Sequence, residues 1–161
     1  MSTIDAFARV ASAGDVAPTG VGRARLALVA GMALAALGVV AWARTPAGIA
    51  AAAAYEADLA AALALMAAVK TGIVGVVTRV LWWRLGWPIT AARASAYLAC
   101  ACSMSAATVA VWTLTAVGAA AVAFHAGELG LLVLAASDRG PLAAAVRRGA
   151  PRSRMPADKR T

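Results

Sequence analysis

Four long apolar stretches dominate the sequence and restrict what it can fold into. They run from Leu26 to Trp42, from Leu59 to Leu81, from Ala94 to Trp112 and from Ala119 to Ala136, so each is 17 to 23 residues long. About 20 residues of helix cross the hydrocarbon core of a bilayer. With 63% hydrophobic and 14% charged residues, a 161-residue chain is too apolar for a soluble domain. Four segments cannot close a barrel, so we predict an all-α, integral membrane four-helix bundle.

The basic residues indicate how such a bundle is oriented. If the stretches cross a membrane, 13 of the 15 basic residues fall on one side, whereas Arg44 falls on the other side beside Glu56 and Asp58, and Lys70 lies within a span. The 13 are Arg9, Arg23, Arg25, Arg79, Arg84, Arg93, Arg139, Arg147, Arg148, Arg152, Arg154, Lys159 and Arg160. Basic loops beside membrane segments stay in the cytoplasm. We therefore expect both termini to be cytoplasmic.

This arrangement divides the chain into three parts. Residues 1–25 form a cytoplasmic lead, residues 26–136 a transmembrane domain, and residues 137–161 a basic cytoplasmic tail that we expect to be disordered. Each basic residue near the surface contributes about 1 kcal/mol of attraction to anionic lipid, so we expect the tail to bind such lipid. The net charge of +8 does not indicate a specific nucleic-acid partner, because the basic residues flank spans and are not interleaved with stacking aromatic residues.

A cleaved signal peptide is the alternative interpretation of the first stretch. Arg23 and Arg25 precede it, and Ala41-Trp42-Ala43 resembles a cleavage site with small residues. The apolar run is longer than the usual core of about 7–15 residues, which favours a retained span. Cleavage would leave three spans.

The connections can also be predicted. Gly86-Trp87-Pro88 provides an inner turn, and we expect Ala50–Asp58 to form a helix that continues into the second span. The apolar run Ala94–Ala136 is too long for one crossing at about 1.5 Å per residue. We place its turn at Thr113–Gly118, where Gly118 can adopt turn angles and the threonines can bond free backbone groups.

Two charged residues within the spans form the candidate site. Counted from the outer ends of their spans, Lys70 and Glu128 lie at nearly equal depth, and Ser103 reaches the same layer. His125 precedes Glu128 by three residues and therefore shares its helix face. We predict an intramembrane polar site of Lys70, Glu128, His125 and Ser103, acting either as a structural ion pair or as a relay for protons or small ions.

Cofactor, metal and catalytic motifs are weak or missing in this sequence. Cys100, Cys102 and Met104 suggest a soft-metal site, but Cys102 would point away from the other two on a helix, which also argues against a disulfide. His125 is the single histidine, so haem would need a ligand from elsewhere. We predict no cofactor, no metal and no enzymatic activity.

These features leave several possible functions. We expect a small accessory or assembly subunit of a larger complex in a bacterial inner membrane, with other membrane proteins or a second copy as partners. Alanine and arginine are abundant, which is typical of a GC-rich bacterial genome. The alternatives are a transport bundle using Lys70, Glu128 and His125, a haem-binding membrane anchor and a holin-like protein.

Overall fold

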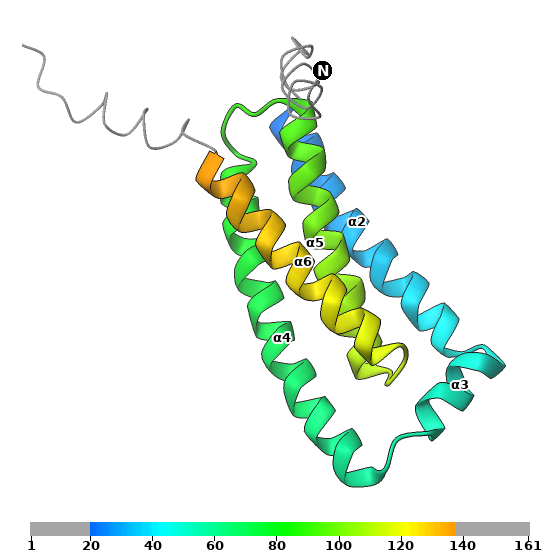
Figure 1. The fold of residues 1–161 in the computed structure, drawn as a ribbon. Helices are drawn as coiled ribbons and strands as arrows, with labels where there is room; N and C mark the ends of the chain where they lie inside the picture. The colour runs from blue at the N-terminus through cyan, green and yellow to red at the C-terminus, as the bar shows by residue number, and fades with distance from the viewer. Residues whose placement is uncertain (1–19, 138–161) are drawn as a thin grey trace, which may run out of the picture.

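The computed structural model describes residues 20–137, and within this range the fold consists of helices without strands (Figure 1). The helices are α2 (Val21–Ala43), α3 (Pro46–Ala53), α4 (Ala57–Arg84), α5 (Ala91–Trp112) and α6 (Val117–Ser137). All but α3 are long and apolar enough to cross a membrane, which confirms the prediction of an all-helical fold with four candidate spans. The predictions for residues 1–19 and 138–161, which include most of the lead and nearly all of the tail, lie outside the described residues.

The central helix of the fold is α5, which packs against α2, α4 and α6 (Figure 1). The long helices alternate in direction, so the described chain begins and ends at the same end of the bundle, which we call the inner end. Because every other long helix borders α5, the buried residues gather around it. The helix α4 extends past the short turn between α5 and α6 at the other, outer end.

Small residues let α5 approach its neighbours on two sides. A side chain built at Gly130 of α6 would have its Cβ 2.8 Å from Cys100 Sγ, and one built at Gly31 of α2 would have its Cβ 3.0 Å from Cys102 Sγ. Positions i and i+2 point in different directions on a helix. The two thiols therefore face different helices, as the sequence predicts, and each occupies space that a neighbouring glycine leaves open.

The turn between α5 and α6 follows the prediction in place but not in its details. Residues 113–116 connect the helices, and the Thr113 hydroxyl donates to the Val109 carbonyl over 3.0 Å, as expected for a threonine at a helix end. The expectation for Gly118 is wrong, because this residue lies within α6. Leu114 and Ala116 adopt the left-handed conformation instead, with φ of 55° and 50°. Thr115 is fully buried between them, and its burial fixes where the chain turns.

Replacing Ala116 by glycine should therefore stabilise the protein. A non-glycine residue in the left-handed region costs about 1 kcal/mol, and exposed Ala116 loses no packing on substitution, so Ala116→Gly should raise the free energy of unfolding by about that amount. Denaturant titration of the purified protein in detergent measures this. The control is Ala119→Gly, an exposed position within α6, which should lower the free energy by about 1 kcal/mol. If both variants lose the same free energy of unfolding, Ala116 is not in the left-handed conformation.

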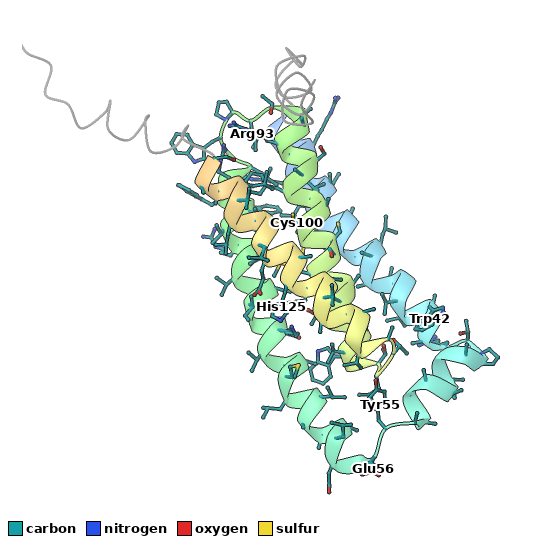
Figure 2. The ribbon with its side chains drawn as sticks, in the orientation of Figure 1. Trp42, Tyr55, Glu56, Arg93, Cys100 and His125 are labelled. Atoms are coloured by element: carbon teal, nitrogen blue, oxygen red, sulfur yellow. The ribbon has the colours of Figure 1, made fainter. Side chains whose placement is uncertain are left out.

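The outer connection differs from the prediction of one helix over Ala50–Asp58. The helix α3 ends at Ala53 and α4 begins at Ala57, because Glu56 adopts an extended backbone with ψ of 154°. Tyr55 is half-buried and packs against the cluster of α4, α5 and α6 that contains Phe124. Docking of this ring bends the chain away from the helical path. Figure 2 shows Tyr55 and Glu56 together at the start of α4.

Candidate functional site

A groove runs between α4 and α6 and contains two of the predicted site residues. Ile73 and Val77 from α4 and His125, Glu128 and Leu132 from α6 are among its lining residues, and its volume is 490 Å³. It is open because α4 and α6 both pack on α5 but make few contacts with each other. Figure 2 shows His125 on α6 beside α4. A largely apolar groove thus presents one imidazole and one carboxylate.

Lys70 bridges from α4 to α6 beside this groove. Its side chain is only 6% exposed, and its Nζ atom lies 3.6 Å from the ring centroid of Phe124, which is itself buried. An ammonium group above an aromatic face is stabilised by the ring quadrupole, and more strongly when both groups are removed from water. The long lysine side chain thus places its charge against α6, where no small α4 residue could reach.

Glu128 lies one helical turn from Phe124 and bonds to the neighbouring histidine. His125 Nδ1 and Glu128 Oε2 are 2.9 Å apart, and the histidine ring packs edge-on against Phe124 with centroids 5.7 Å apart. Glu128 also attracts Lys70 electrostatically. Within residues 20–137, however, the direct contact of the Lys70 ammonium group is with Phe124, so Glu128 acts on Lys70 through space. The structure brings the three predicted residues together around Phe124.

Ser103 lies next to these residues, and its hydroxyl joins α5 to α6. Its hydroxyl donates to the Ala123 carbonyl over 3.1 Å and so ties α5 to the backbone of α6. Two residues along α5, the Ser105 hydroxyl donates to the Met32 carbonyl of α2 over 3.2 Å. The two serines fasten the central helix to neighbours on different sides. Ser103 therefore positions α6 and has no group of the groove as a hydrogen-bond partner.

Two aromatic residues of the site were not predicted from the sequence. The ring of Phe124 lies against the Lys70 ammonium group. Trp112 Nε1 donates over 3.0 Å to Oγ1 of Thr71, the residue that directly follows Lys70 in α4. Phe124 could have been found, because it is four residues before Glu128 and thus on the same helix face. In the sequence, Trp112 only marks the end of the third apolar stretch. Its bond to Thr71, the fifteenth residue of α4 counted from Ala57, shows how far α4 extends beyond α5.

The site combines two groups that can exchange a proton and one buried cation. The His125 imidazole shares a hydrogen bond with the Glu128 carboxylate, and the Lys70 ammonium group lies against the ring of Phe124. Among residues 20–137, no three His, Cys, Asp or Glu side chains gather where they could hold a metal ion. The arrangement can bind a hydrogen-bonding or cationic group in the groove, or pass protons along it. Comparisons of the chain with protein families, with curated proteins and with solved structures find no match.

Proposed function

We propose that the protein is a multi-pass subunit of a larger complex in a bacterial inner membrane, with both termini in the cytoplasm. The four apolar helices support the membrane location. The distribution of arginines supports the orientation, since Arg93 lies at the opposite end of the bundle from Glu56 (Figure 2). A role as a partner for other proteins is supported by one feature of the groove.

That feature is the exposure of a polar pair in the middle of a candidate span. Glu128 is the twelfth of the 21 residues of α6, and the side chains of His125 and Glu128 are 65% and 33% exposed. Lipid chains offer no hydrogen bonds, so ionisable residues at this depth face protein or enclosed water. Residues 20–137 leave the pair uncovered. We infer that a transmembrane helix of another subunit covers the groove and bonds to this pair.

Site-specific photo-crosslinking in intact membranes tests this proposal. A crosslinking amino acid replaces either Leu132 in the groove or Leu34 on α2, two leucines that are 66% and 68% exposed. We expect a discrete protein adduct from position 132, none from position 34, and loss of the adduct when Glu128→Leu is added. Adducts with lipid alone at both positions, or the same protein adduct at both, would contradict a specific partner in the groove.

A transport bundle is the second candidate, favoured by the grouping of Lys70, Glu128 and His125 around Phe124. An imidazole bonded to a carboxylate near a cation has the groups that a proton or ion path requires. Purified protein in liposomes should then conduct protons or small cations without a partner, and Glu128→Gln should abolish the flux. If liposomes that contain the purified protein stay impermeable to protons and small cations, the subunit role is better supported than transport.

A further inference from the structure

A second groove lies at the inner end of α4 and shares no lining residue with the first. It is lined by Gly75, Thr78, Arg79 and Trp82, and its volume is 440 Å³. The groove is shallow and open to the surroundings along its length. Since all four residues belong to one helix, the groove follows α4 lengthwise, from Gly75 within the candidate span towards the inner end at Trp82.

The inner half of this groove is positively charged. The exposed Arg79 guanidinium makes no hydrogen bond or ion pair with residues 20–137. Arg25 of α2 lies 5.2 Å above the ring centroid of Trp82, and its Nε donates to the Trp82 carbonyl over 3.0 Å. Two guanidinium groups therefore border the same tryptophan, and one of them has no partner in the described chain.

The described part of the chain supplies no carboxylate to balance these charges. Residues 20–137 contain three acidic residues: Glu56 and Asp58 lie at the outer end and Glu128 lies near the middle of α6. Arg25 and Arg79 lie at the inner end, away from all three of these carboxylates. A bound anion would balance the charge of Arg79, which no carboxylate of residues 20–137 does.

The remainder of the groove is apolar. A side chain built at Gly75 would meet no atom within 4 Å, so the wall of the groove is open there. The Thr78 hydroxyl donates to the Val74 carbonyl over 2.7 Å and also contacts Met32 Sδ, so it is engaged within the protein. A ligand that fits therefore has an anionic group for Arg79 and an apolar body beside Gly75.

We propose that this groove binds an anionic phospholipid, with the phosphate on Arg79 and an acyl chain along α4 over Gly75. The proposal depends on the membrane location and is independent of a partner in the first groove. Trp82 would lie at the level of the headgroups, where tryptophan is enriched in membrane proteins. The site differs from the one expected in the basic tail, because it combines a fixed charge with a groove for a chain.

Native mass spectrometry of the full-length protein, released from nanodiscs of phosphatidylcholine with phosphatidylglycerol, tests the proposal. Arg79→Gln should lower the ratio of retained phosphatidylglycerol to phosphatidylcholine about tenfold, because it removes a direct hydrogen bond to a charged group, which contributes about 1.5 kcal/mol. Arg23→Gln is the matched control, since it removes the same charge at the same end but outside the groove, and it should change the ratio less than twofold. Gly75→Leu should fill the groove and reduce retention of phosphatidylglycerol without touching another residue.

Three outcomes would overturn the proposal. Equal losses in Arg79→Gln and Arg23→Gln would show diffuse attraction to the inner surface. Unchanged retention in Gly75→Leu would show that no acyl chain occupies the groove. Equal retention of both lipids by the unsubstituted protein would show that the anion is not selected. Circular dichroism of each variant confirms that the helices are intact.

Discussion

Gly127→Leu is expected to separate α6 from α5 and to lower the free energy of unfolding by about 3 kcal/mol. A Cβ atom at Gly127 would lie 2.6 Å from Met104 Cγ and 3.1 Å from the Cys100 carbonyl oxygen. Met104 is fully buried, and the carbonyl belongs to the central helix, so neither can give way. Denaturant titration of the purified protein in detergent measures the loss, and crosslinking through Leu132 should also fall because the groove changes shape.

Gly72→Leu is the matched control for this substitution. Gly72 lies within α4, and a side chain built there would meet no atom within 4 Å. The same change in helix propensity then occurs without a collision, so stability should stay constant or rise slightly. If Gly127→Leu and Gly72→Leu change the free energy of unfolding equally, the close approach of α5 and α6 at Gly127 is not present in the protein.

Lys70→Ala is expected to have the second large effect, also a loss of about 3 kcal/mol. The substitution leaves a cavity beside buried Phe124 and removes the cation that attracts Glu128. Losing a buried side chain of this size costs about 2–5 kcal/mol, because the cavity that it leaves is only partly refilled. Unfolding in detergent measures the loss, and Arg147→Ala in the tail should change stability by less than about 0.5 kcal/mol.

A double-mutant cycle separates the contact with Phe124 from the loss of volume. Lys70→Met keeps most of the side-chain volume and removes the charge, and Phe124→Leu keeps an apolar residue and removes the ring. We expect a coupling of about 2 kcal/mol between them, the value for a desolvated cation above an aromatic ring. Additive effects would show that the ammonium group does not rest on Phe124.

The sequence was sufficient to predict the helices because their signal is local. Apolar runs of spanning length are visible residue by residue, and the predicted range Leu59–Leu81 lies within α4. The turn at Leu114 and Ala116 was harder to predict, since glycine is the usual left-handed residue and Gly118 lies nearby in the sequence. The break at Glu56 was also hidden, because it depends on the docking of Tyr55 against residues far along the chain.

For the candidate site, sequence reasoning identified the charged residues but not their contacts. Lys70, His125 and Glu128 stand out because charges within apolar runs are rare. The role of Phe124 was missed, since an aromatic residue in an apolar helix gives no such signal. The depth of Lys70 relative to α6 depends on how far α4 extends past Trp112. That offset comes from packing between helices, which span lengths do not reveal.

Reporter fusions test the central claim, that the chain crosses a membrane four times with its basic ends inside. A fluorescent protein that folds only in the cytoplasm is fused to each terminus, and alkaline phosphatase, active only outside, is inserted between α3 and α4 at residue 54. The account predicts fluorescence from both fusions and phosphatase activity from the insertion. Fluorescence from one terminus alone would place the termini on opposite faces, and it would contradict the four-crossing arrangement on which the position of Glu128 in the middle of the membrane depends.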